Sequence, residues 1–280
     1  MSDTRAFPAP GKLNLFLHVT GRRDDGYHEL QTLFQIIDYG DTLSFTPRAD
    51  DAIRRVTDLP DIPQEDDLTV RAARALTGGD TPPFGVDIAI EKRLPAGGGL
   101  GGGSSDAATT LVALNELWGL GLGVDELARI GLGLGADVPV FVHGHTAFAE
   151  GIGEQLTPVE YARLWYLIIH PGCAVSTAEV FSDPELTRLT PPIRISAFSY
   201  ARTGNDCEPV ARRLYAPVAD ALDWLGARAD GARMTGTGAC IFAPFEVEAH
   251  ARAVAAEVPT PWRGFVARGV NRSPLLDALR

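Results

Sequence analysis

A run of glycines between residues 97 and 103 constrains this chain more than any other stretch of its sequence. The surrounding segment reads LPAGGGLGGGSSDAA, and it lies between a strand-like stretch ending near Lys92 and an apolar-periodic stretch that begins at Ser104. Ordered glycine costs conformational entropy, so a folded chain uses six in seven positions only where the backbone needs unusual dihedral angles or close contact with a ligand. A strand, a glycine loop and a helix N-terminus form a phosphate cradle, because backbone N–H groups and the helix dipole favour an anion. We therefore interpret the run as an anion-binding loop rather than a flexible linker.

Two other phosphate-binding motifs fit this loop poorly. A Walker A loop ends in Gly-Lys-Ser or Gly-Lys-Thr, whereas this loop ends in Gly-Ser-Ser-Asp without a lysine. Gly97, Gly99 and Gly102 match the dinucleotide pattern G-x-G-x-x-G, and GLGLGA at residues 131–136 resembles it, but a stretch this rich in glycine matches by chance. A dinucleotide site also needs an early βαβ unit, and none is predicted before the loop. A dinucleotide-dependent oxidoreductase therefore rests on these glycines alone.

Charge and composition argue against several classes of function. The chain has 280 residues, enough for one large domain or two modest ones, and a net charge of -11. An acidic chain without a basic run is a poor partner for nucleic acid or for an anionic membrane surface. The sequence has no apolar run long enough to span a membrane, no signal-peptide pattern, and only three widely spaced cysteines. We therefore expect a cytoplasmic protein without disulfides.

Residue periodicity predicts a mixture of strands and helices. In the stretch from Lys12 to Thr20, positions 13, 15, 17 and 19 are apolar, so Lys12 and Asn14 share the other face of a half-buried strand. A turn at Asp25 and Gly26 should return the chain into a second strand. Further strands are expected at 29–37, 41–47, 85–92, 137–151, 165–172 and 264–270. Helices are expected at 65–78, 104–118, 124–135, 208–227 and 246–258, which indicates an α+β arrangement of helices layered on a sheet.

Lys12 and Asp137 are candidates for chemistry, although position alone does not single out either residue. Only two of the 25 basic residues are lysines, Lys12 and Lys92. This indicates positions where the planar guanidinium of arginine would not be suitable. Read by position, Asp137 is a turn or capping aspartate and Lys12 is a solvated charge. His143 and His145 lie two apart on an expected strand and would share a face, but the sequence shows no third metal ligand.

Four stretches together resemble one family, the GHMP kinases. They are PAPGKLNLFLHVTGRRDDGYHELQTLFQIIDYGD, LPAGGGLGGGSSDAA, LGADVPVFVHGHTAFAEGIGE and RMTGTGACIFAPF. The resemblance covers nearly the whole chain and implies a two-domain α/β fold with a cleft between the domains. It implies an N-terminal nucleotide-binding domain over residues 1–157 and a C-terminal, ferredoxin-like substrate domain over residues 158–280. Composition marks no sharp boundary there.

The resemblance also implies that the glycine loop binds ATP. The ATP-binding residues would be Lys92, Pro95, Ala96, Gly97, Gly98, Gly99, Leu100, Gly101, Gly102, Gly103, Ser104, Ser105 and Asp106. Lys12 and Asp137 match the family's catalytic pair: Asp137 would accept or orient the proton of the acceptor hydroxyl, and Lys12 would stabilise charge on the γ-phosphoryl group. Mg²⁺ is expected to bridge the phosphates; its ligands are unknown, with Ser105 as the candidate among the loop serines.

The stretch DGYHEL is the most specific part of the resemblance. It implies ATP-dependent phosphorylation of the 2-hydroxyl of 4-diphosphocytidyl-2-C-methyl-D-erythritol, in non-mevalonate isoprenoid precursor biosynthesis. Tyr27 and His28 would hold the cytosine ring, and Phe181 would close the stack from the second domain. Asn14 would contact the methylerythritol part, and Thr177 is a weaker candidate for the same role. The expected partner is this small molecule, with neither nucleic acid nor membrane, and the expected assembly is a monomer or a weak homodimer.

The resemblance has one departure near the implied nucleotide site, and two other functions compatible with the same family remain as hypotheses. Asp67 stands where relatives usually have asparagine, near the implied adenine pocket, and its carboxylate would alter contacts with the base. A mevalonate-type or homoserine-type GHMP kinase is a second hypothesis, but those acceptors need no cytosine pocket. A catalytically inactive nucleotide-binding sensor is a third, and intact Lys12 and Asp137 argue against it.

Overall fold

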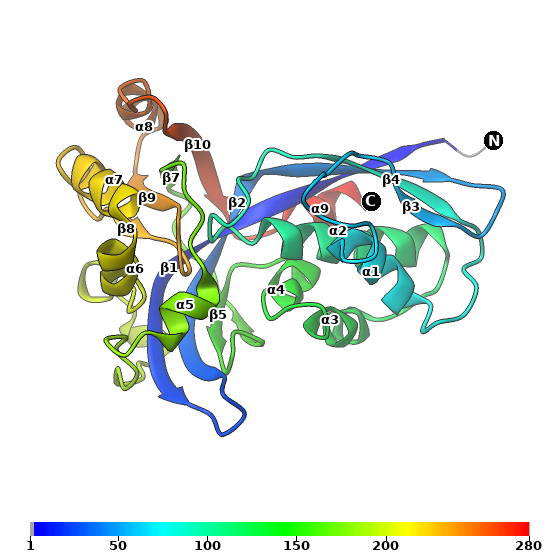
Figure 1. The fold of residues 1–280 in the computed structure, drawn as a ribbon, viewed down its shortest axis with the longest axis horizontal. Helices are drawn as coiled ribbons and strands as arrows, with labels where there is room; N and C mark the ends of the chain where they lie inside the picture. The colour runs from blue at the N-terminus through cyan, green and yellow to red at the C-terminus, as the bar shows by residue number, and fades with distance from the viewer. Residues whose placement is uncertain (1–2, 280) are drawn as a thin grey trace.

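Two long antiparallel strands, β1 (Arg5–Arg22) and β2 (His28–Pro47), run through both halves of the molecule (Figure 1). They belong to a computed structural model that describes residues 3–279. The expected turn joins them: Gly26 has a φ of 91°, and the Asp25 side chain accepts a hydrogen bond from the backbone N–H of Tyr27. Both strands are longer than their periodicity predicts, because register shifts between β1 and β2 let the pair bend without ending.

One sheet connects the two halves. The ten strands found within residues 3–279 pair in the order β3-β4-β2-β10-β7-β9-β8, with β1 and β5 also paired to β2 and β6 paired to β5. At the junction, Val270 of β10 lies opposite Ile36 of β2. The remaining strands are β3 (Ile53–Arg55), β4 (Val86–Glu91), β5 (Ala147–Glu150), β6 (Gln155–Pro158), β7 (Trp165–His170), β8 (Arg233–Met234), β9 (Ile241–Phe245) and β10 (Arg263–Val270).

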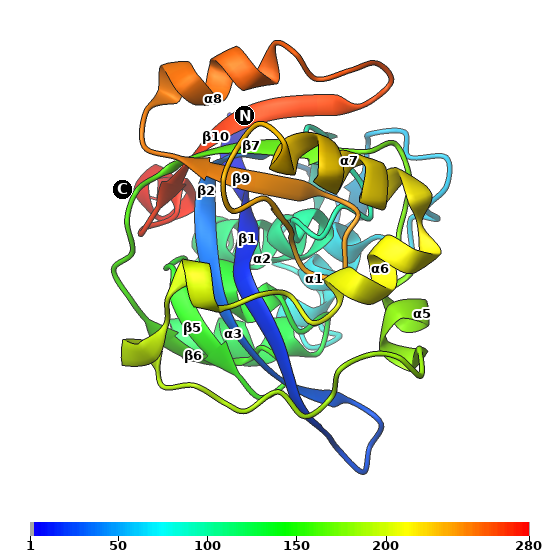
Figure 2. The same cartoon turned by 90° about the vertical axis from the view of Figure 1, so that its left-hand side faces the viewer.

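The helices form two groups, one on each half of the sheet (Figures 1 and 2). The first group is α1 (Leu68–Leu76), α2 (Gly102–Leu117), α3 (Val124–Leu132) and α4 (Val138–His143). The second group is α5 (Thr177–Ser182), α6 (Glu208–Leu214), α7 (Ala216–Gly226) and α8 (Glu248–Ala255). The last helix, α9 (Pro274–Ala278), returns to the first half, where Leu275 joins the core formed with α2 and α4.

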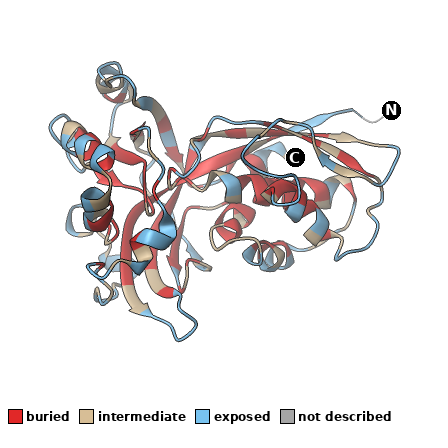
Figure 3. Ribbon diagram, in the orientation of Figure 1, coloured by how far each residue is buried: buried red, intermediate tan, exposed pale blue. Residues whose placement is uncertain are grey.

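Strand β1 is buried on both faces, so the expectation of a half-buried strand is wrong. Leu13 and Leu15 are 0% exposed, and Lys12 and Asn14 on the opposite face are each only 3% exposed. The burial colouring shows β1 and β2 red where they pass between the two halves (Figure 3). Alternation along the sequence shows which positions are polar, but it does not show which are exposed to solvent. Here the polar side chains of β1 lie inside the molecule because they line a site between the halves.

Two helical regions differ from their sequence patterns. Residues 138–143 form helix α4 instead of a strand; a short apolar run fits either structure, and Pro139 in the first turn and left-handed Gly144 at the end suit a helix. His143 and His145 are therefore not on a shared strand, and residues 3–279 contain no cluster of three or more potential metal-ligating side chains. The expected helix 208–227 is interrupted at Tyr215, and it restarts as α7 with a proline in its first turn.

Within the described part of the chain, no helix is both long enough and apolar enough to cross a membrane.

Candidate active site

The glycine loop lies between β4 and α2, and it packs against the second half of the chain. The backbone N–H of Ala239 donates to the carbonyl of Gly97 at 3.0 Å, and that of Cys240 donates to Gly98 at 3.1 Å. Gly99 has a φ of +72°, and a Cβ atom added to it would lie 2.2 Å from the carbonyl oxygen of Thr235. Glycine is required at this position for both its dihedral angle and the close backbone approach.

Helix α2 starts within the loop, and its first amide groups are left for a ligand. Its N-cap residue is Gly101, in the left-handed conformation, and no side chain within residues 3–279 caps it. The two serines therefore do not act as caps. Ser105 Oγ donates to the carbonyl of Pro10 at 2.7 Å and is fully buried, whereas Ser104 lines a cavity on each side of the loop. The helix N-terminus thus presents N–H groups, a positive dipole end and one accessible hydroxyl.

Three adjoining hollows extend from this loop to the hairpin end of β1 and β2. The loop cavity, about 690 Å³, is lined by the glycine loop together with residues 59–62, 66–69, 90 and 92–95. The central cavity, about 330 Å³, contains Lys12 and Asp137 and shares Gly97, Gly99 and Ser104 with the loop cavity. The aromatic pocket, about 530 Å³, is lined by Tyr27, His28 and Phe181 among others, and shares Thr177 and Phe181 with the central cavity. A ligand in the loop cavity and another in the aromatic pocket would therefore meet in the central cavity.

Lys12 and Asp137 form an ion pair in the central cavity, with 3.3 Å between Lys12 Nζ and Asp137 Oδ2. Asp137 occupies the N-cap position of α4, but in the described chain its carboxylate makes no capping hydrogen bond. The carboxylate is 34% exposed, so it can reach a ligand, while the Lys12 side chain is only 3% exposed. The structure therefore brings together two residues whose spacing in the sequence gave no sign of proximity.

Neighbouring polar groups hold the Lys12 ammonium in place. Lys12 Nζ donates to Asn14 Oδ1 at 2.6 Å and to the carbonyl of Gly99 at 3.0 Å. The side-chain nitrogen Nδ2 of Asn14 donates in turn to Thr32 Oγ1, and the backbone N–H of Asn14 donates to Thr235 Oγ1. A buried ammonium needs such partners because leaving it unpaired would be costly. Both ends of the Asn14 amide are thus occupied, which makes orientation of Lys12 its visible role.

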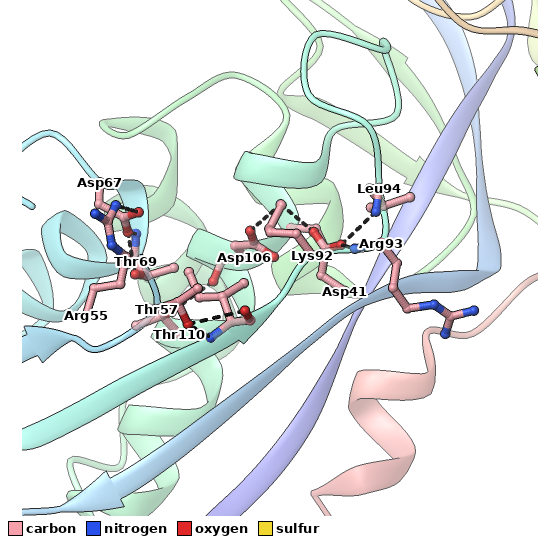
Figure 4. A network of polar contacts seen from close by, with 12 residues as sticks. Asp41, Arg55, Thr57, Asp67, Thr69, Lys92, Arg93, Leu94, Asp106 and Thr110 are labelled. Carbon is pink, nitrogen blue, oxygen red and sulfur yellow. Dashed lines mark hydrogen bonds and ion pairs between the residues drawn. The ribbon is translucent and has the colours of Figure 1, made fainter. Parts of the chain in front are cut away.

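Lys92 lies under the loop between two buried aspartates (Figure 4). Lys92 Nζ is 2.5 Å from Asp41 Oδ2 and 2.8 Å from Asp106 Oδ2, and Asp41 also accepts the backbone N–H groups of Arg93 and Leu94. Burial alone would lower the pKa of Lys92, but Asp106 and Asp41 raise it above its usual value. Burial raises the pKa of Asp106 to about 7, with Asp41 adding to the effect and Lys92 opposing it. The trio anchors the chain where it enters the loop.

Asp67 has little freedom to contact a bound base, which answers the question raised by this departure from the family pattern. Its Oδ1 accepts the Thr69 side chain and the backbone N–H groups of Thr69 and Val70, capping α1. Its Oδ2 is paired with Arg55 Nη1 at 2.9 Å (Figure 4). Burial alone would raise the pKa of Asp67, but the bonds from Thr69 and Arg55 lower it. The carboxylate is therefore neutralised and engaged inside the protein.

The aromatic pocket brings the hairpin end of β1 and β2 against α5. The rings of His28 and Phe181 stack, with centroids 5.0 Å apart and an angle of 24°, while Tyr27 is 59% exposed at the rim. Phe181 thus lies over His28 in this structure, and both rings line the pocket together with Tyr27. Thr177 opens α5 at the junction with the central cavity and hydrogen-bonds to Thr237 through its hydroxyl.

Sequence reasoning missed several residues that shape these hollows. Thr235, Gly236 and Thr237 approach Lys12 and the glycine loop from the second half, and Asp41 anchors the entry to the loop. The two glycines of the motif TGTGA at 235–239 could have indicated an unusual backbone here, and Gly236 and Gly238 do adopt positive φ angles. The sequence around Asp41 does not indicate that it anchors the loop, because its partners Lys92, Arg93 and Leu94 are 51 to 53 positions away.

Comparison with known proteins identifies the family. The model of the GHMP kinases N terminal domain matches residues 67–145, and that of the GHMP kinases C terminal matches residues 186–264. The chain is 59% identical over 280 residues, all of its length and 96% of the relative's, to a protein of Alkalilimnicola ehrlichii named 4-diphosphocytidyl-2-C-methyl-D-erythritol kinase. This chain belongs to the GHMP kinases.

Further relatives of this GHMP kinase agree. A protein of Cupriavidus necator with the same name is 58% identical over 279 residues, covering 98% of this chain and 95% of that one. Among solved structures, 4-(cytidine 5'-diphospho)-2C-methyl-D-erythritol kinase superposes with a TM-score of 0.81 at 34% identity, covering 96% of this chain and all of the other. A homoserine kinase of Cytophaga hutchinsonii, at 18% identity and a TM-score of 0.66 over 98% of this chain and 96% of its own, shares the fold alone. The two-domain GHMP fold expected from the sequence is thereby confirmed.

Proposed function

We propose that this GHMP kinase transfers the γ-phosphoryl group of ATP to the 2-hydroxyl of 4-diphosphocytidyl-2-C-methyl-D-erythritol. The observation that carries the proposal is the Lys12–Asp137 pair, which faces the glycine loop in a cavity continuous with an aromatic pocket. The high identity to relatives named for this acceptor, over nearly their full lengths, supports the same assignment.

In this reaction Asp137 orients the acceptor hydroxyl and accepts its proton as the phosphoryl group transfers. Its partly exposed carboxylate is the group in the central cavity that can do so, because the Lys12 ammonium has only donors. Lys12, held by Asn14 and Gly99, stabilises negative charge on the transferring group. Phosphoryl transfer passes through a loose transition state, so positioning and charge neutralisation supply most of the catalysis.

ATP occupies the loop cavity, with its phosphates against the amides of the glycine loop and the start of α2. Mg²⁺ fits this site because it needs few protein ligands when phosphates and waters supply the others. Ser104, which lines both cavities, is better placed to hold it than Ser105, whose hydroxyl is engaged with Pro10. When bound, the metal would neutralise charge on the phosphates.

The cytidine end of the acceptor occupies the aromatic pocket. Tyr27 and Phe181 supply apolar faces for a base, and His28 supplies a ring nitrogen at its edge. The methylerythritol part then extends past Thr177 toward Asn14 and the catalytic pair. This arrangement assigns ATP binding to a domain of residues 1–157 and base recognition largely to contacts between that domain and residues 158–280.

The test is ADP release from ATP and Mg²⁺ with a panel of acceptors. The panel holds 4-diphosphocytidyl-2-C-methyl-D-erythritol, the cytidine-free methylerythritol phosphate, mevalonate and homoserine. Turnover with the cytidine compound alone is the expected result. Turnover with mevalonate or homoserine would keep a GHMP kinase and reject the base pocket, and ATP binding without turnover on any acceptor would favour a nucleotide sensor.

A further inference from the structure

Arg188 connects the segment after α5 to the edge of the aromatic pocket. Its Nη2 donates to the carbonyls of Phe181 at 3.0 Å and Asp183 at 2.6 Å, and its Nη1 donates to that of Leu186 at 3.1 Å. Its Nε lies 3.2 Å from His28 Nε2 and donates to it. One guanidinium therefore holds the backbone that carries Phe181 and also touches the imidazole on which Phe181 stacks.

This contact dictates where His28 carries its proton. A guanidinium has donors only, so His28 Nε2 must be the acceptor and the ring proton must be on Nδ1. Burial lowers the pKa of His28, and the nearby Arg188 and Arg22 lower it further, which agrees with a neutral ring. Stacking on Phe181 fixes the plane of the ring.

The remaining ring nitrogen is left for a ligand. Within residues 3–279, His28 Nδ1 has no hydrogen-bond partner, and it is not one of the polar atoms buried without one, so it is open to solvent. The residue itself lines the aromatic pocket. Nδ1 is therefore the ring nitrogen of His28 that remains able to donate a hydrogen bond to a ligand in this pocket.

We propose that Arg188 is a positioning residue that holds His28 in its Nδ1–H tautomer and thereby makes the pocket select cytosine over uracil. Cytosine presents a ring nitrogen, N3, that accepts a hydrogen bond, whereas N3 of uracil carries a hydrogen and would oppose the Nδ1–H group. A site built to donate one hydrogen bond discriminates against a ring that cannot accept it, because both donors are then left unpaired. The selection of cytosine rests on the proposed function, whereas the tautomer belongs to the free protein.

The first measurement is the tautomer of His28 in the free protein by ¹⁵N-detected imidazole NMR, with the signal assigned by its loss in His28→Asn. The native protein should show a protonated Nδ1 and an unprotonated Nε2. Arg188→Met removes the donor, so the ring should shift toward the Nε2–H form that free imidazole side chains favour. Arg213→Met is the matched control: Arg213 bonds Asp183 and Glu185 on the same segment and should leave the tautomer unchanged.

The second measurement compares the binding of cytidine diphosphate and uridine diphosphate to the same variants. Arg188→Met should reduce the preference for the cytidine compound by about tenfold, the value of one neutral hydrogen bond, with ATP affinity unchanged. In a His28→Asn background, the same substitution should have little further effect on preference. An unchanged tautomer in Arg188→Met, or an equal loss of preference with and without His28, would overturn the proposal. Absence of turnover on every acceptor would instead count against the proposed function and leave the tautomer result standing.

Discussion

Lys12 is a buried ammonium whose charge is shared among Asp137, Asn14 and a loop carbonyl. Of the two side chains among these partners, Asp137 is 34% exposed and Asn14 is only 3% exposed, and Asp137 stands at the start of α4. The two charges therefore have different roles. Lys12 is fixed by the protein, whereas Asp137 is available to a ligand on one side while it pairs with Lys12 on the other.

Replacing Asp137 tests this division of roles. Asp137→Ala should lower kcat by about 10²- to 10⁴-fold, the usual contribution of a positioned acid–base group. ATP affinity should stay close to native, because Asp137 does not line the loop cavity. Steady-state kinetics and an ATP titration measure the two effects, with Asp125→Ala, an exposed aspartate in the first turn of α3, as the control. Near-native turnover in Asp137→Ala would make Asp137 a turn residue.

His18 is a buried residue outside the reacting groups, and it links stability to pH. Burial lowers its pKa, Asp206 raises it and Arg233 lowers it, with a net shift below the ordinary value of 6.5. The unfolded chain therefore binds a proton more readily than the folded protein. His18 contributes stability that is complete above pH 6.5 and is lost as pH falls through its folded-state pKa.

The pH dependence of thermal unfolding checks this linkage. Between pH 7.5 and 5, Tm of His18→Gln should fall less than that of the native protein, since one proton contributes up to about 1.4 kcal/mol per pH unit. The comparison concerns the slope and not the absolute cost of the substitution. His250→Gln, at an exposed position on α8, is the control, and equal slopes in His18→Gln and native protein would contradict the prediction.

At the scale of elements, the glycine loop is shaped by its contact with the segment that follows β8. Two backbone hydrogen bonds join the loop to Ala239 and Cys240, and Gly99 approaches Thr235 too closely to allow a side chain. These contacts hold the loop against the second half in the absence of any phosphate. Holding the loop in this way would reduce the entropy lost on binding an anion.

Two glycines with similar dihedral angles separate strain from crowding. Gly78→Ala, at a φ of +63° with no heavy atom within 4 Å of the added Cβ, should cost about 1–2 kcal/mol for the left-handed conformation alone. Gly99→Ala should cost more and should also weaken ATP binding, because the loop must move away from Thr235. Urea unfolding and ATP titration measure both effects. Equal costs at the two positions would mean that the loop is not held against the second half.

At the scale of the whole molecule, the last helix returns to the half that contains the start of β1. After β10 pairs with β2, residues 271–279 leave the second half, and α9 packs Leu275 into the core of the first. A third core cluster, which includes Leu13, Tyr166 and Phe242, lies between the halves. Because one sheet and one core cluster span the molecule, we expect the halves to unfold together.

Leu275 tests this coupling from the far end of the chain. Leu275→Ala removes a side chain that is 1% exposed, and it should destabilise the protein by about 2–5 kcal/mol. Calorimetry should show one transition shifted to lower temperature. Leu189→Ala, at an 82% exposed position, should change Tm little. Two resolved transitions, with only one displaced by Leu275→Ala, would mean that the halves unfold independently.

The sequence by itself determined the features that depend on local interactions. The loop with its following helix, the turn at Asp25 and Gly26, and the placement of Lys12 beside Asn14 all follow from glycine content, turn chemistry and the two-residue period of a strand. The family also follows from motifs that can be read along the chain.

Only the tertiary structure decided which of these residues meet. The Asp137 carboxylate turns to Lys12 instead of capping α4, residues 138–143 form a helix, and β1 is buried on its polar face. Arg188 reaches His28 across 160 positions. Each outcome depends on packing between segments far apart in the chain, where an apolar run or a lone charged residue has several local solutions of similar free energy and the surrounding elements select one.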